Sequence, residues 1–106
     1  MPENQRFYLR ARQTEKEYLV AICDAELLGE TICDGDLELY VSERFFGGEL
    51  VIQDKCIEEM LKATSLNIIG QSIVNLAIKH RIINEQSVMW IDCPEHGKVG
   101  HAMLLR

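Results

Sequence analysis

A chain of 106 residues, 47% of them hydrophobic, is predicted by its length to form one domain, and it is long enough to bury a hydrophobic core without staples. It contains no apolar run near the roughly 20 residues of a membrane-spanning helix and no apolar signal-peptide core, so no membrane partner is expected. The net charge of −6 argues against general binding to nucleic acid, and we expect no DNA partner.

The acids are concentrated in one part of the chain. Residues 24–54 contain nine acids and one base, Arg44, so the remainder carries a net charge of +2. A local basic surface is therefore compatible with the overall charge. Four cysteines are present, and in the cytoplasmic location that we expect they stay reduced and pack as small apolar residues.

The N-terminal part predicts a tail followed by two strands. Residues 1–5 are expected to form a flexible tail, and residues 6–106 a single domain. Apolar and polar residues alternate over residues 7–12, which is typical of a half-buried strand. Residues 18–23 are apolar on both faces and predict a central strand.

An acidic segment with turn signals follows. Asp24 predicts the N-cap of one helical turn at residues 25–28. A short strand is expected at residues 31–33, and alternation predicts another at residues 37–41. Residues 42–49 are expected to form a tight loop, and residues 51–52 a brief return to the sheet.

Two helices are predicted in the middle of the chain. Asp54 is expected to cap the first, whose apolar face would hold Ile57, Met60, Leu61 and Thr64. Residues 65–81 are apolar around most of their girth and predict one long core helix. Asn67 is expected to cap that helix by accepting from the Gly70 amide.

The C-terminal part returns to strands. Residues 88–92 predict a strand and residues 93–97 a turn. In the last strand Val99, His101, Met103 and Leu105 share one face. The order of strands, helix pair and strands predicts a single α+β domain with a mainly antiparallel sheet and two packed helices.

Four short motifs carry a family resemblance: residues 23–29, residues 46–49, residues 67–70 with Val74 and Ala77, and residues 100–102. Together they resemble the small archaeal family called domain of unknown function 424, from about Tyr8 to Arg106. The family usually has proline before the last histidine, where this chain has Gly100, and residues 93–96 look like an insertion. The resemblance implies an archaeal cytosolic protein. Because the family has no established activity, it supplies no catalytic residue.

Cys93 and His96 form a C-x₂-H pair, and His101 follows. With another cysteine these residues could bind zinc in a tetrahedral site. A closed zinc site usually has two paired ligand hooks, and only one is present here. Cys93 and His96 can equally flank a proline turn, so we expect no cofactor.

A small enzyme is the alternative class. His101 could act as a base together with Glu49 and Asn67, since functional groups concentrate on loops and helix starts. Gly47 and Gly48 could bring the backbone close to a ligand. Equally, His101 can be a hydrogen-bonded core residue, Glu49 a solvated acid and Asn67 a cap. No complete catalytic motif is present, which argues against an enzyme.

Arg6, Tyr8, Arg10 and Arg12 lie on one strand face. Guanidinium groups and an aromatic ring are the mixture that RNA-binding surfaces use. The same residues are also typical of a solvated outer face of an edge strand. We therefore expect a binding or adaptor module for protein or RNA, with the translation apparatus as one setting. The residues do not determine the oligomeric state.

Overall fold

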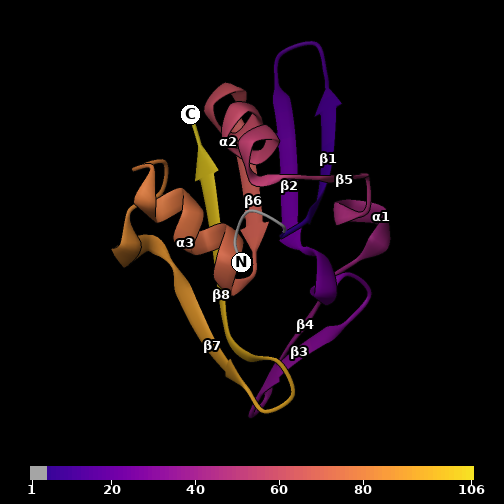
Figure 1. Ribbon diagram of the computed structural model, residues 1–106, viewed down its shortest axis with the longest axis vertical. Helices are drawn as coiled ribbons and strands as arrows, with labels where there is room; N and C mark the ends of the chain where they lie inside the picture. Colours follow the sequence, from indigo (N-terminus) through magenta and orange to yellow (C-terminus); the bar gives the residue numbers. More distant parts are fainter. Residues whose placement is uncertain (1–4) are drawn as a thin grey trace.

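The computed structural model describes residues 5–106, so the predicted tail, apart from Gln5, lies outside the described residues. Figure 1 shows the arrangement of the elements. The strands are β1 (Phe7–Gln13), β2 (Tyr18–Asp24), β3 (Thr31–Asp34), β4 (Leu37–Tyr40), β5 (Glu49–Val51), β6 (Ser65–Ile69), β7 (Met89–Cys93) and β8 (Gly97–Leu105). The helices are α1 (Glu43–Phe46), α2 (Gln53–Lys62) and α3 (Gln71–Lys79), with 3₁₀ turns at Ala25–Leu27 and Glu85–Ser87.

Within the described chain, six strands form one sheet in the order β5-β1-β2-β6-β8-β7. All neighbouring pairs in it are antiparallel except β2 with β6, which are parallel. The β3–β4 hairpin forms a separate small sheet. Helices α2 and α3 lie together on one face of the large sheet (Figure 1). The predicted α+β domain with a mainly antiparallel sheet and two packed helices is confirmed.

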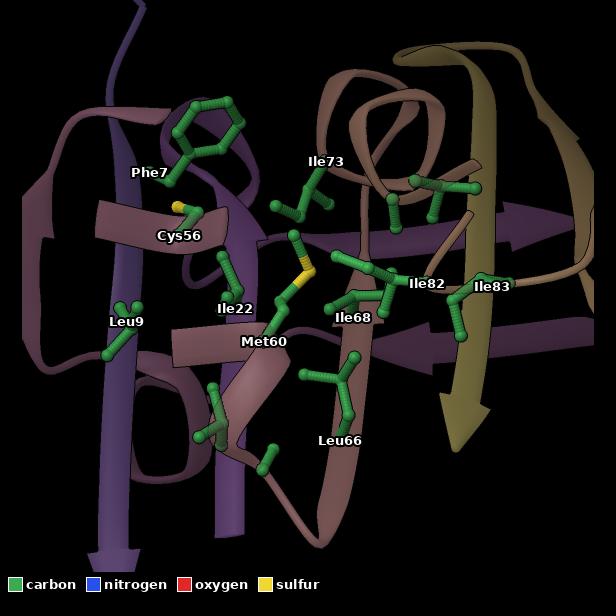
Figure 2. Packing of buried hydrophobic residues seen from close by; sticks show 14 of the residues in the cluster. Phe7, Leu9, Ile22, Cys56, Met60, Leu66, Ile68, Ile73, Ile82 and Ile83 are labelled. Atoms are coloured by element: carbon green, nitrogen blue, oxygen red, sulfur yellow. The ribbon is translucent and has the colours of Figure 1, made fainter. Parts of the chain in front are cut away.

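A first hydrophobic core lies between the sheet and helices α2 and α3. Figure 2 shows Met60 of α2 among Ile22, Ile68 and Ile73, which come from two central strands and α3. Ile82 and Ile83, which follow α3, close this core toward β8. These side chains are almost fully excluded from water, and each such burial stabilises the fold by about 1.5–3 kcal/mol.

A second core lies on the opposite face of the sheet. There Ala21, Cys23 and Ile69 pack against side chains of the segment between β2 and β5, chiefly Ile32 and Phe46. That segment holds the β3–β4 hairpin, α1 and six of the 17 acids. Because it is short, it covers only one end of this face.

The prediction of one long helix over residues 65–81 is wrong. Residues 65–69 form strand β6, and α3 begins only at Gln71. Strand β6 lies between β2 and β8, and its residues 65–68 alternate between polar and apolar. Because Leu66, Ile69 and Ile73 also recur at helical spacing, this short strand resembles the start of α3.

The change from β6 to α3 occurs at Gly70, which has a φ of 136°. Beside it lies Asp24, whose side chain is 2% exposed. Its Oδ2 accepts from the Ser72 amide at 3.0 Å and its Oδ1 from the Ile73 amide at 2.9 Å. Asp24 therefore caps α3 from strand β2. The predicted local cap on residues 25–28 is wrong, because the Asp24 side chain makes no cap hydrogen bond to that turn. Asn67, the predicted cap, lies inside β6.

Two further predictions need correction. The expected loop at residues 42–49 contains the helical turn α1, because Ser42 Oγ accepts from the amides of Arg44 and Phe45. Helix α2 begins at Gln53 with Ile52 as N-cap residue, so Asp54 lies in the first turn and is not the cap. Of its predicted apolar face, Met60 is buried and Leu61 is 61% exposed.

Glu59 is a second buried acid. It accepts from the Tyr18 hydroxyl and lies 3.3 Å from Lys55 Nζ and 3.1 Å from Lys62 Nζ. Burial raises the pKa of Glu59, but the hydrogen bonds from Tyr18, Lys62 and Lys55 outweigh it and hold the pKa below its usual range. Glu59 thus joins α2 to β2 as a carboxylate.

Replacing Gly70 by alanine should destabilise the protein strongly. The added Cβ would overlap the Asp24 carboxyl group and would impose an unfavourable φ. We expect a loss of at least about 3 kcal/mol in urea unfolding. Gly35→Ala is the matched control, since Gly35 also has a positive φ of 64° but nothing within 4 Å of the added Cβ. It should cost only about 1–2 kcal/mol. Equal losses for the two variants would contradict this account.

The burial of Asp24 should make stability depend on pH. Burial raises its pKa to about 6, although the Ser72 and Ile73 amides act in the opposite direction. An unfolded aspartate titrates near about 3.9, so between these values the folded state binds more protons and stability falls as the pH rises. Relative to Asp24→Asn, the wild type should lose up to about 3 kcal/mol between about pH 4 and about pH 7. Denaturant unfolding across this pH range measures the stability of the wild type relative to Asp24→Asn. A relative stability that stays constant or rises with pH would contradict this account.

Candidate functional site

The segment between β2 and β5 covers only one end of the second sheet face. The uncovered end of this face contains a groove of about 460 Å³. Its floor is formed by β2 and β6, and its sides by β1 and α1 on one hand and β8 on the other. The surface of the groove is mostly apolar. The lining residues are Arg12, Leu19, Val20, Ala21, Phe45, Ser65, Leu66, Asn67, Met103, Leu104 and Leu105.

Large apolar side chains at the rim of the groove are open to water. Met103 is 64% exposed, Leu105 79% and Phe45 41%. Met103 and Leu105 lie on the same face of β8, as predicted from the alternation of the last strand. Adjacent exposed apolar side chains around a concavity are typical of binding surfaces. The open groove is therefore the strongest candidate site on this face.

His101 and Asn67 meet at the inner end of the groove. Asn67 Oδ1 lies 3.0 Å from His101 Nε2. Because an amide oxygen can only accept, the imidazole Nε2–H is the donor in this pair. Burial lowers the pKa of His101, which favours the neutral ring. Two of the three residues predicted for an active site are thus brought together.

Glu49 is not brought to this pair. It pairs with Leu9 across β1 and β5, and residues directly opposite each other share a face of the sheet. Leu9 belongs to the first core, under the helices, so Glu49 points away from the face that carries His101 and Asn67.

Gly47 and Gly48 allow the backbone that follows α1 to lie close to β1. A Cβ on Gly48 would overlap the Leu9 carbonyl oxygen, so the backbones meet too closely for any larger residue. The Gly47 carbonyl accepts from Arg10 Nη2. The two glycines therefore position α1, and through it Phe45, beside the groove.

Tyr8, Arg10 and Arg12 share the groove face of β1, as the alternation predicts, and Arg6 precedes the strand. Tyr8 packs against the second core. Arg12 Nη2 donates to the Arg44 carbonyl at 2.9 Å, and its guanidinium lies 5.6 Å from the centre of the Phe45 ring. Arg10 and Arg12 thus both hold α1 in place, and RNA contact by this face stays a prediction.

Cys93 and His96 lie at the β7–β8 turn, far from His101. Cys93 pairs with Gly97, and His101 pairs with Met89, four residues further along β7, which is about 13 Å. His96 Nε2 lies 3.4 Å from Glu30 Oε1. Residues 5–106 contain no group of three or more His, Cys, Asp or Glu side chains placed to hold a metal. The four cysteines are all unpaired, and the expectation of no cofactor stays a prediction.

Most residues that line the groove were not predicted as site residues. Ala21, Phe45 and Ser65 were not candidates, because their roles depend on which strands become neighbours. Alternation already placed Met103 and Leu105 on one face of the last strand, but their exposure depends on which face of the sheet the helices cover.

Fold and groove together define a small single-domain α+β protein with one sheet face partly open to solvent. The chain belongs to the family described as "Protein of unknown function (DUF424)", whose model matches residues 12–102. This agrees with the resemblance drawn from the sequence motifs. Among curated proteins none matches this chain.

A similar fold occurs in a structure titled "Crystal structure of an uncharacterized conserved protein from Methanopyrus kandleri", a protein of an archaeon. The two chains are 21% identical, with a TM-score of 0.74 over 95% of this chain and 94% of the other. At that identity the likeness concerns the fold. Among the described helices, none has the length and apolar character needed to cross a membrane.

The pairing with Asn67 can be tested through the titration of His101. In the wild type we expect the ring to titrate below its ordinary value of about 6.5, because burial disfavours the charged form. Asn67→Asp places a carboxylate against Nε2 and should raise the pKa by about one unit or more. Proton NMR of the imidazole, assigned with His101→Gln, measures both. An unchanged pKa in Asn67→Asp would mean that the two side chains do not meet.

Proposed function

We propose that this protein is a non-catalytic binding module of the cytoplasm, and that it holds an apolar segment of a protein partner in the groove beside β8. The observation that carries the proposal is the groove itself, with Met103, Leu105 and Phe45 exposed around an apolar floor. Burying one such side chain at an interface contributes about 1.5–3 kcal/mol. The four unpaired cysteines support a reducing compartment.

The separation of Glu49 from His101 and Asn67 supports binding rather than catalysis. A general base needs the reacting groups within hydrogen-bond reach, and these side chains lie on opposite faces of the sheet. His101 has a structural task here, since it orients an amide that lines the groove.

The chemistry of the groove favours a protein partner over RNA. Its surface is mainly apolar, and the chain as a whole carries −6. Single-stranded RNA is held by cationic grooves with stacked aromatic rings. The guanidiniums of Arg10 and Arg12 already donate to carbonyls of the α1 region.

A displayed peptide library selected on the immobilised protein tests the proposal. Selected peptides should bind Met103→Ser about tenfold more weakly than the wild type, because an apolar contact worth about 1.4 kcal/mol is lost. Leu61→Ser is the matched control, since Leu61 is as exposed as Met103 but lies on α2, across the sheet. It should leave binding unchanged.

Two results would contradict the proposal. One is a selection without a common sequence, or with peptides that bind Met103→Ser as well as the wild type. The other is salt-dependent binding of a single-stranded RNA oligonucleotide that Arg12→Glu weakens, which would replace the protein partner by RNA.

A further inference from the structure

The polar groups that line the groove all offer hydrogen-bond donors. Asn67 Oδ1 accepts from His101 Nε2–H, which leaves both N–H donors of the amide for the groove. Arg12 uses one N–H of its guanidinium on the Arg44 carbonyl and keeps others, since the group carries five. Ser65 adds a hydroxyl.

The charge of the groove is also one-sided. Among the residues of the described chain that line it, Arg12 is the one charged side chain, and none is acidic. A groove without an acidic side chain is unusual in a protein with 17 acids and 11 bases. A guanidinium with an amide donor nearby matches a carboxylate, which accepts hydrogen bonds at both oxygens.

We propose that the groove binds the C-terminal residue of the partner, with its apolar side chain against Met103 and Phe45 and its α-carboxylate between Arg12 and the Asn67 NH₂ group. The inference rests on the proposed function and names the part of the partner that is recognised. A C-terminal residue carries an apolar side chain and a carboxylate on the same Cα. Both can therefore enter one groove of about 460 Å³ that has donors and apolar walls together.

In this arrangement His101 is a positioning residue. It touches no ligand atom, but its Nε2–H holds the amide oxygen and turns the NH₂ group toward the groove. Asn67→Asp keeps an acceptor for His101 and replaces the donor by a negative charge. This variant therefore separates the ligand-binding role of Asn67 from its contact with His101.

The experiment uses N-acetyl-L-leucine as a minimal C-terminus and N-acetyl-L-leucinamide as the same molecule without the charge. Titrations are followed through the NMR signals of the Asn67 side-chain amide and the Met103 methyl group. We expect the acid to bind the wild type at least about tenfold more tightly than the amide, since charge-assisted hydrogen bonds are about twice as strong as neutral ones.

Variants locate the effect. Arg12→Gln should bring acid and amide to equal affinity, and Asn67→Asp should abolish binding of the acid. Arg44→Gln is the matched control, because it removes the same charge from the neighbouring α1 without altering the lining of the groove. It should keep the preference for the acid.

Each other outcome overturns the inference. Equal affinity of the acid and the amide for the wild type would be compatible with the proposed binding module, but it would show that the groove does not recognise a carboxylate. Binding of N-acetyl-leucyl-glutamyl-leucinamide as tight as that of the free acid would identify an internal acidic segment as the occupant. If neither leucine compound shifts the groove signals, the C-terminus is not the ligand, and the peptide selection decides the proposed function separately.

Discussion

The fold depends on one contact between distant parts of the chain, the capping of α3 by the buried side chain of Asp24. Helix α3 starts directly after β6, at a glycine with no side chain to cap it, and Asp24 supplies acceptors for the Ser72 and Ile73 amides. Asp24 ends β2, and β2 lies parallel to β6. The cap thus sets the point at which β6 turns into helix. A buried carboxylate without such donors would cost several kcal/mol.

The parallel pairing that this cap supports also places the candidate site. It aligns Ala21 with Asn67, and the antiparallel neighbour β8 aligns Met103 with the same residue. A small side chain in the middle and a long one beside it leave a hollow, and His101 reaches Asn67 diagonally from β8. On the other side, the close approach of Gly48 to β1 holds α1 so that Phe45 forms a wall. The groove is therefore a consequence of the sheet order.

Local patterns predicted most of the strands, including β2, which is covered on both faces, but failed at the short strand β6. Strand β1 alternates clearly, because the face with Phe7 and Leu9 meets the first core and the other face carries the arginines. Strand β6 has only five residues, and Leu66 and Ile69 continue the helical spacing of Ile73, so it resembled the start of α3. The site was predicted in part: Asn67 and His101 were both candidates, but Glu49 was misplaced because its face depends on pairing with Leu9. The partner of Asp24 lies 48 residues away, beyond any local cap signal.

The distribution of charge has a consequence for any anionic partner. The net charge of −6 offers an anionic partner no attraction at long range, and beyond about 8–10 Å the charge of Arg12 is screened at physiological salt. Long-range attraction therefore cannot guide such a partner to Arg12. Recognition has to arise from apolar burial against Met103 and Phe45 together with hydrogen bonds made at contact. Added salt should weaken the repulsion by the net negative charge at least as much as the attraction to Arg12, so the affinity should not fall with salt. At a nucleic-acid site, by contrast, the affinity falls steeply with salt.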